Sequence, residues 1–300
     1  MNIINFGAID IGSNAARLLI SSVNIDDPEP KLRKNILLRI PLRLGEDVFS
    51  KGKIGDYRLK KFVRMMKAFK QLIKIYEVRA YKIYATSAMR EAANSRKAVE
   101  TISNKTGLKI EVIDGKTEAG IIVNSRPADY PFDKKYLYVD VGGGSTELTL
   151  IENGKLNESK SFNVGTLRIL AGKVKTDEWV SMKKWLESVL SKNETVEMIG
   201  VGGNINKLYR LAELKKNEQF TSDKLKEVYC TLKQFTVEDR MKKYDMRPDR
   251  ADVIIPAAEI FMFIADESNI FDINVPTVGL ADGMIGDIFN DFKLAHSINN

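Results

Sequence analysis

The stretch Tyr136 to Leu150, YLYVDVGGGSTELTL, gathers residue types that can bind and activate phosphate. An alternating apolar run ends on Asp140, a glycine turn follows, and Glu147 begins a second β-type run. This pattern is typical of a β-hairpin with a glycine-rich turn. Successive backbone N–H groups in such a turn form an anion site, because glycine puts no side chain between the main chain and a ligand. The two carboxylates suit Mg²⁺, which favours carboxylates together with substrate phosphates. We therefore expect a metal site at Asp140 and Glu147 and phosphate-binding groups at Gly142, Gly143, Gly144, Ser145 and Thr146.

The same pattern occurs near the N-terminus, which indicates an internal duplication. Phe6 to Ile20 reads FGAIDIGSNAARLLI, again a β-run, an aspartate (Asp10), a Gly-Ser turn and a second β-run. The two aspartates lie 130 residues apart, and a shorter version, MIGVGGN, spans Met198 to Asn204. The first turn predicts further phosphate-binding groups at Gly12, Ser13 and Asn14, with Asp10 close to metal or water.

The elements around the two motifs repeat in a similar order. In each half the hairpin and a third strand, such as Asn35 to Leu44, precede helices that alternate with strands. Between this third strand and a long helix from Leu59 to Tyr76, three glycines indicate a loop. This order predicts an α/β protein of two duplicated lobes, with a ligand-binding cleft between them. We place the lobes at residues 1–124 and 125–300, with the last helix, about 282–300, able to pack back on the first lobe.

The composition limits the classes of function. The 47 Lys and Arg exceed the 40 Asp and Glu, a balance that favours polyanions, although the basic residues are scattered along the sequence. With only Cys230 and His296, we expect no disulfide framework, no thiolate metal cluster and no Ser-His-Asp or Cys-His catalysis. The sequence opens without a signal-peptide pattern, and its most apolar stretch, Val253 to Ala265, is too short to span a bilayer. These features favour a cytoplasmic protein with no membrane partner.

Six segments together resemble the exopolyphosphatase/guanosine-pentaphosphate phosphatase (Ppx/GppA) family of the actin-like, ribonuclease H-like superfold. They cover most of the chain in the family's order: AIDIGSNAARLLI, ATSAMREA, IDGKTEA, VDVGGGSTEL, GVGGN and RADV. The resemblance implies two actin-like lobes and hydrolysis of a terminal phosphoanhydride. Its implied substrates are inorganic polyphosphate and guanosine pentaphosphate, and its implied cofactor is Mg²⁺.

The resemblance also implies roles for individual residues. Glu118 matches the family's catalytic glutamate, which positions or deprotonates the attacking water. Asp140 and Glu147 match the acidic residues that handle Mg²⁺, and Asp10 takes the corresponding place in the first loop. Arg17 and Arg90 match positions that present basic or polar groups to the phosphate chain.

The chain departs from the family's pattern at three points, and two other functions stay open. Thr117 replaces one of two paired glutamates, Asn204 stands where the third glycine loop usually has threonine, and the long helical C-terminal extension of larger members is absent. The alternatives are a non-catalytic binder of guanosine tetra- or pentaphosphate or an actin-like protein and, less favoured, an ATP-dependent small-molecule kinase. We expect no nucleic-acid partner, and a homodimer is possible.

Overall fold

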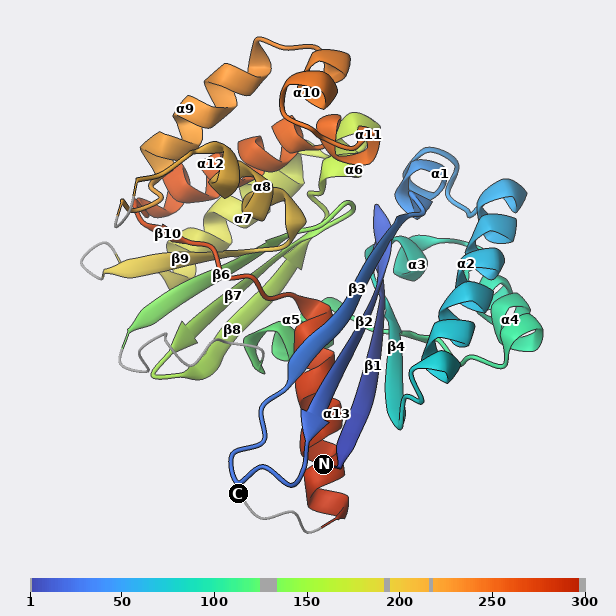
Figure 1. The fold of residues 1–300 in the computed structure, drawn as a ribbon. Helices are drawn as coiled ribbons and strands as arrows, with labels where there is room; N and C mark the ends of the chain where they lie inside the picture. The colour runs from blue at the N-terminus through green and yellow to red at the C-terminus, as the bar shows by residue number, and fades with distance from the viewer. Residues whose placement is uncertain (1, 125–133, 192–194, 216–217, 297–300) are drawn as a thin grey trace. The chain divides into compact units, whose positions relative to one another are not determined.

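The computed structural model describes residues 2–124, 134–191, 195–215 and 218–296 (Figure 1). The chain divides into two compact units, one formed by residues 1–126 and 279–300 and the other by residues 127–278. The predicted boundary after residue 124 falls at the start of residues 125–133, which lie outside the described residues, as do residues 297–300 of the predicted last helix. Within the described residues, none of the helices combines the length and apolar character needed to cross a bilayer.

The first unit combines a sheet with helices from both ends of the chain. Its elements are β1 Ile3–Ile11, β2 Ala15–Asn24, β3 Arg33–Pro41, α1 Leu44–Lys51, α2 Asp56–Ile75, β4 Ala80–Ala85, α3 Ser87–Glu91, α4 Ser95–Thr106, β5 Glu111–Val112, α5 Gly115–Asn124 and α13 Leu280–Ala295. The sheet order is β3-β2-β1-β4-β5. Strands β1, β2 and β3 pair antiparallel, whereas β4 and β5 join in parallel.

Helix α13 lies against this first sheet although most of the chain separates it from β1 (Figure 1). The ring of Phe6 on β1 contacts Phe289 and Phe292 of α13, at centroid distances of 5.9 and 5.4 Å. At Gly283 the helix approaches α5 so closely that a Cβ would stand 2.1 Å from the carbonyl oxygen of Ile121. Because any larger residue would clash there, Gly283 permits the close packing of α13 on α5.

The second unit repeats this plan. Its elements are β6 Lys135–Val141, β7 Thr146–Glu152, β8 Lys155–Phe162, α6 Thr166–Leu170, α7 Thr176–Val189, β9 Val196–Val201, α8 Gly203–Leu211, α9 Ser222–Lys233, α10 Val237–Lys243, α11 Pro248–Ala251, α12 Ile254–Ser268 and β10 Ile273–Asn274. The strand order of its sheet is β10-β9-β6-β7-β8. Read from the opposite edge, this order and the strand directions match those of the first sheet, so that β6, β7 and β8 correspond to β1, β2 and β3. This correspondence confirms the predicted duplicated, actin-like α/β fold.

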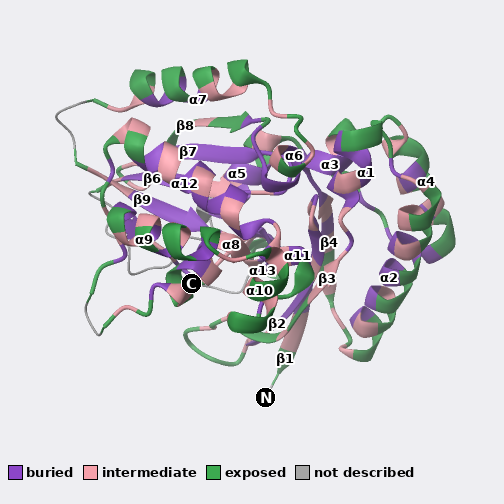
Figure 2. Cartoon of the chain, turned by 90° about the horizontal axis from the view of Figure 1, so that it is seen from above, coloured by how far each residue is buried: buried purple, intermediate pink, exposed green. Residues whose placement is uncertain are grey.

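The core of the second unit forms because apolar residues of the sheet meet an almost wholly apolar helix. Strands β6 and β7 are buried along nearly their whole length (Figure 2). Helix α12 covers them with buried residues that include Ile260, Phe261 and Ile264. Burial of this apolar surface, at about 25 cal/mol per Å², stabilises the sheet that carries the glycine turn.

One predicted element is wrong. Residues 45–55, expected as a loop because of their glycines, contain the helix α1. Its Asp47 is buried and accepts hydrogen bonds from the backbone N–H of Gly55 and from Arg58, at 3.0 and 2.6 Å. These tertiary contacts outweigh the low helix propensity of Gly45.

Candidate functional sites

The glycine turn of the second unit joins β6 to β7 and places two carboxylates side by side. The backbone N–H of Gly142 donates to the carbonyl of Ser145 at 2.9 Å, which closes the turn. In the antiparallel register Asp140 stands directly opposite Glu147. Because opposite residues of an antiparallel pair point to the same face of a sheet, their carboxylates share one face.

Three consecutive carbonyl groups of this turn point toward α6. The carbonyl of Gly142 accepts from the N–H of Thr166 at 3.0 Å, and that of Gly143 accepts from Leu167 and Arg168 at 2.8 and 3.1 Å. The carbonyl of Gly144 accepts from Nε of Arg168 at 2.7 Å. These contacts also fix the direction of the N–H groups, since C=O and N–H point in opposite directions in a trans peptide.

The N–H groups of Gly143, Gly144 and Ser145 therefore point away from α6. Within the part of the chain that the structure describes, no acceptor for these three N–H groups is present. Successive N–H groups directed to one side form a concave anion site. The predicted phosphate-binding turn thus has the backbone orientation that such a site requires.

Two residues that hold this turn were missed in the sequence analysis. Arg168 is 8% exposed and reaches back 24 residues to Gly144. Gly165 packs so tightly on Gly144 that a Cβ would lie 2.4 to 2.6 Å from three of its backbone atoms. The segment FNVGTLRI contains both residues, but nothing in its local pattern indicates a contact with Gly144.

Glu147 is held rigidly, whereas Asp140 is more open. Glu147 is 4% exposed, and its Oε1 accepts hydrogen bonds from the hydroxyls of Ser145 and Ser161 at 2.6 and 2.9 Å. Asp140 is half-buried beside Gly202, where a Cβ would stand 3.1 Å from its Oδ1. Gly202 also has a φ of 98°, which favours glycine. Thr146, also predicted to bind phosphate, is fully buried, and its hydroxyl donates to the carbonyl of Val164 at 2.6 Å.

The glycine turn of the first unit has the same strand register as that of the second, but the pair of charged residues beside it differs. The N–H of Gly12 donates to the carbonyl of Ala15, and Asp10 stands opposite Arg17, as Asp140 stands opposite Glu147. Arg17 donates to Oδ2 of Asp10 at 2.7 Å, and Asp10 is 4% exposed. The first turn therefore presents a carboxylate neutralised by its neighbour, and the second turn presents two carboxylates.

Helices α1 and α3 fix the first turn. The carbonyls of Ser13 and Asn14 accept from the N–H groups of Gly45 and Arg43 at 2.9 and 2.8 Å. The hydroxyl of Ser13 accepts from the N–H of Ala88 at 3.1 Å. Both turns are thus anchored through their carbonyl groups by the segments that follow the third strand of each sheet.

Glu118 and Arg90 form an ion pair in the first unit. Nη1 of Arg90 donates to Oε2 of Glu118 at 2.8 Å and to the carbonyl of Ile113 at 3.0 Å. Glu118 is 7% exposed in the first turn of α5. The same turn is capped by Asp114, whose pKa is lowered by the hydrogen bond from the backbone N–H of Thr117. The carboxylate of Glu118 is therefore held in one orientation.

A third glycine turn follows β9. Arg250 donates to the carbonyl of Gly203, and a Cβ on Gly203 would stand 2.7 Å from Nη2 of the arginine. The side-chain amide of Asn206 donates to the carbonyl of Gly202 at 2.8 Å. The segment RADV thus contributes an arginine that contacts a glycine turn 47 residues earlier.

The predicted site residues fall into one group in each unit. The first group is Asp10, Gly12, Ser13, Asn14, Arg17, Arg90 and Glu118, and the second is Asp140, Gly142, Gly143, Gly144, Ser145, Thr146 and Glu147. Within the described ranges, no group of three or more His, Cys, Asp or Glu side chains is placed to hold a metal ion. A cation at Asp140 and Glu147 would accordingly take its other ligands from water or phosphate, as Mg²⁺ commonly does.

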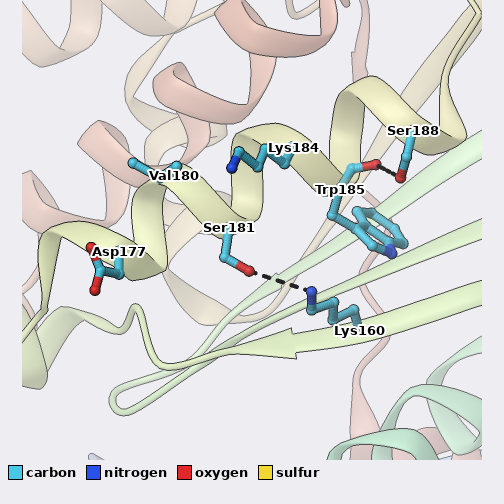
Figure 3. Close-up of a pocket in the computed structure, with 7 residues that line it drawn as sticks. All are labelled: Lys160, Asp177, Val180, Ser181, Lys184, Trp185 and Ser188. Carbon is cyan, nitrogen blue, oxygen red and sulfur yellow. Dashed lines mark hydrogen bonds between the residues drawn. The ribbon is translucent and has the colours of Figure 1, made fainter.

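A separate cavity of about 550 Å³ lies between α7 and β8 (Figure 3). Lys160 of β8 points toward Ser181 of α7, and its Nζ lies 3.3 Å from the hydroxyl oxygen. The lining residues are Lys160, Asp177, Val180, Ser181, Lys184, Trp185 and Ser188, so the predicted phosphate-binding and metal residues are not part of it.

Comparison with known proteins shows which protein family this chain matches. The model of the Ppx/GppA phosphatase family matches residues 37–292. A crystal structure described as an exopolyphosphatase from Cytophaga hutchinsonii aligns with a TM-score of 0.81 and 22% identity, covering 96% of this chain and 98% of that chain. The latter comparison supports the shared fold.

Three curated relatives differ in length from this chain. A bifunctional 3-dehydroquinate synthase/phosphatase of Fusobacterium nucleatum is 28% identical over 86% of this chain, which spans 43% of that protein. Exopolyphosphatase 1 of Mycobacterium tuberculosis is 22% identical over 84% of this chain and 78% of its own length. The guanosine-5′-triphosphate,3′-diphosphate pyrophosphatase of Photobacterium profundum is 20% identical over 96% of this chain and 60% of its own length.

Proposed function

Because the chain belongs to the Ppx/GppA phosphatase family, we propose that it hydrolyses a terminal phosphoanhydride bond. The substrate would be inorganic polyphosphate or the 5′-γ-phosphate of guanosine pentaphosphate, since relatives are named for these two activities. The observation that carries the proposal is the second glycine turn, which directs three consecutive N–H groups to one side and carries two carboxylates. Neither the kinase nor the non-catalytic alternative is favoured by the relatives.

Glu118 would act as general base or water-orienting group. Hydrolysis needs a positioned water, a carboxylate to accept its proton, and donors that stabilise the charge of the transferring phosphoryl group. The ion pair with Arg90 supports the water-orienting role, because it fixes one oxygen of Glu118. Arg90 and Arg17 would also bind phosphate, because a guanidinium donates several hydrogen bonds from one plane.

The backbone N–H groups of each turn would bind phosphate, with Gly12, Ser13 and Asn14 contributing in the first unit. Phosphatases of this family are generally metal-dependent. We assign the cation, Mg²⁺, to Asp140 and Glu147, where two hard oxygen donors stand opposite each other. When bound, it would neutralise charge on the phosphate oxygens. Asp10 would contact metal or water in the first unit, where its Oδ2 also accepts from Arg17.

The test is phosphate release with Mg²⁺ from short polyphosphate, long polyphosphate and guanosine pentaphosphate. We expect Glu118→Gln to lower turnover by at least about 100-fold, the usual scale of general acid–base catalysis. The glutamine keeps an oxygen that can accept from Arg90 but not the charge of the ion pair, so the variant should fold with a melting temperature slightly below that of the wild type. The matched control is Glu158→Gln, which changes an exposed glutamate on β8 and should leave turnover intact.

Retained turnover in Glu118→Gln would remove this residue from the mechanism. Tight nucleotide binding by the wild type without release from any substrate would instead favour a non-catalytic binder.

We propose the cytoplasm as the compartment of the protein. The exposed free thiol of Cys230 is consistent with a reducing environment.

A further inference from the structure

Helix α2 concentrates the positive charge that is scattered in the sequence as a whole. Its sequence, DYRLKKFVRMMKAFKQLIKI, has seven Lys or Arg and a single acidic residue, Asp56. The whole chain has a net charge of only +7. The 3.6-residue helical period brings together basic residues that are three or four positions apart. One helix therefore accounts for most of the excess charge.

Four of these cations form one exposed stripe. Lys60, Arg64, Lys67 and Lys74 are all exposed, at spacings of four, three and seven residues, and they lie within a narrow arc of the helix. The stripe is about 21 Å long at 1.5 Å per residue. Figure 2 shows exposed segments along the outside of α2, opposite its buried residues.

The cations of the stripe have no acidic partner in the part of the chain that the structure describes. In contrast, the half-buried basic residues of α2 are engaged: Arg58 pairs with Glu46 and Asp47, and Lys70 donates to the carbonyl of Thr106. Like charges three or four residues apart destabilise a helix. A bound polyanion would relieve this repulsion.

The stripe begins near the first glycine turn. Helix α1 donates from Gly45 to the carbonyl of Ser13, and Arg58 in the first turn of α2 pairs with Asp47 of α1. Lys60 follows two residues after Arg58, about 200° further round the helix. A polyanion held by its end at the Ser13 turn would therefore pass round the N-terminal end of α2 to reach the stripe.

We propose that the stripe, Lys60, Arg64, Lys67 and Lys74, is a second binding surface for the distal part of long-chain polyphosphate. The inference rests on the proposed function and extends it to chain-length preference. A second contact on the same molecule acts at high effective concentration, so it strengthens binding only of chains long enough to reach it. Short polyphosphate and guanosine pentaphosphate would occupy the turns alone.

The chemistry of the stripe favours inorganic polyphosphate over nucleic acid or a membrane. Binding of single-stranded nucleic acid usually combines cations with exposed aromatic rings on which bases stack. The rings of Phe62 and Phe69 are fully buried, and Tyr57 at one end is the exposed ring of this helix. An interfacial helix would bury an apolar face in lipid, but the apolar face of α2 is buried in its own unit.

The experiment replaces the four cations with glutamine and measures kcat and KM for tripolyphosphate and long-chain polyphosphate over a range of NaCl concentrations. The matched control replaces Lys155, Lys173, Lys184 and Lys242, four exposed lysines of the second unit, with glutamine. We expect the stripe variant to raise KM for the long chain by about tenfold or more, with kcat and the tripolyphosphate constants unchanged. The salt dependence of the long-chain KM should also become weaker than in the wild type.

Equal KM values for the long chain in the wild type and the stripe variant would overturn the proposal. An equal increase of the long-chain KM in the control variant would overturn it as well. Tighter stripe-dependent binding of DNA or of anionic phosphatidylglycerol vesicles than of long-chain polyphosphate would also overturn it. Direct binding of fluorescent long-chain polyphosphate separates this inference from the proposed function. If the wild type releases no phosphate, stripe-dependent binding still supports the surface while the hydrolase proposal fails.

Discussion

Replacing Gly165 with alanine tests whether the position of the second glycine turn determines activity. The added Cβ would meet the carbonyl carbon of Gly144 at 2.4 Å and its Cα and N at 2.6 Å. Ordinary contact starts near 3.4 Å, so the turn or α6 must move by about 1 Å. The φ of Gly165, −149°, is extended and open to alanine, so this effect is steric.

The expected magnitudes follow from this displacement. Overpacking against a backbone that cannot rotate away costs about 1–3 kcal/mol in the free energy of unfolding. A shift of about 1 Å in a phosphate-binding group lowers kcat/KM by about 100-fold. Urea denaturation followed by tryptophan fluorescence gives the first quantity, and phosphate release from folded protein gives the second.

Gly286→Ala is the matched control, because a Cβ at this position in α13 would meet nothing within 4 Å. Alanine there should stabilise the protein by about 0.5–1 kcal/mol, since glycine is the poorer helix former, and should leave turnover unchanged. If Gly165→Ala kept wild-type stability and turnover, the close approach of Gly165 to Gly144 would have no bearing on function. A loss of stability with full turnover of the folded fraction would refute the link between turn position and catalysis.

Two further substitutions test residues close to the second glycine turn and to Glu118. The hydroxyl of Thr166 is buried and has no hydrogen-bond partner among the described residues, so Thr166→Val should keep or slightly raise the free energy of unfolding in urea denaturation. A loss above about 1 kcal/mol would show that the hydroxyl has a partner. The pKa of Asp114 is lowered in the folded state, so its stabilising effect is full above its ordinary pKa of 3.8 and disappears as the pH falls through the lower folded value. The stability advantage of the wild type over Asp114→Asn should therefore shrink on acidification below pH 3.8, and a constant difference from pH 7 to pH 2 would contradict this assignment.

The sequence was sufficient where neighbouring residues determine the structure. Alternating apolar residues and a glycine turn specify a hairpin locally, so the strand pairs around Asp10 and Asp140 could be predicted together with their duplication. The helix α1 was not predicted, because buried Asp47 and its partners Gly55 and Arg58 stabilise it from outside the segment.

The contacts that orient the candidate site residues could not be predicted from local sequence patterns. Arg168 is 24 residues from Gly144, and Arg90 is 28 residues from Glu118. Hydrophobic periodicity relates residues within two turns of a helix or a few positions of a strand, so it carries no information on these pairs. The family resemblance singled out Arg90 and Glu118 separately, and the ion pair between them emerged only from the fold.

The packing of α13 on β1 and α5 has a consequence for the order in which the protein matures on the ribosome. The first unit consists of two segments, and the whole second unit is synthesised between them. Domains fold as units while the chain emerges, so the second unit can complete its core while the first sheet still lacks its covering helix. Until α13 is available, Phe6 of β1 lacks the two aromatic rings that it contacts in the folded protein. The half of the protein that is made first is thus the half that is finished last.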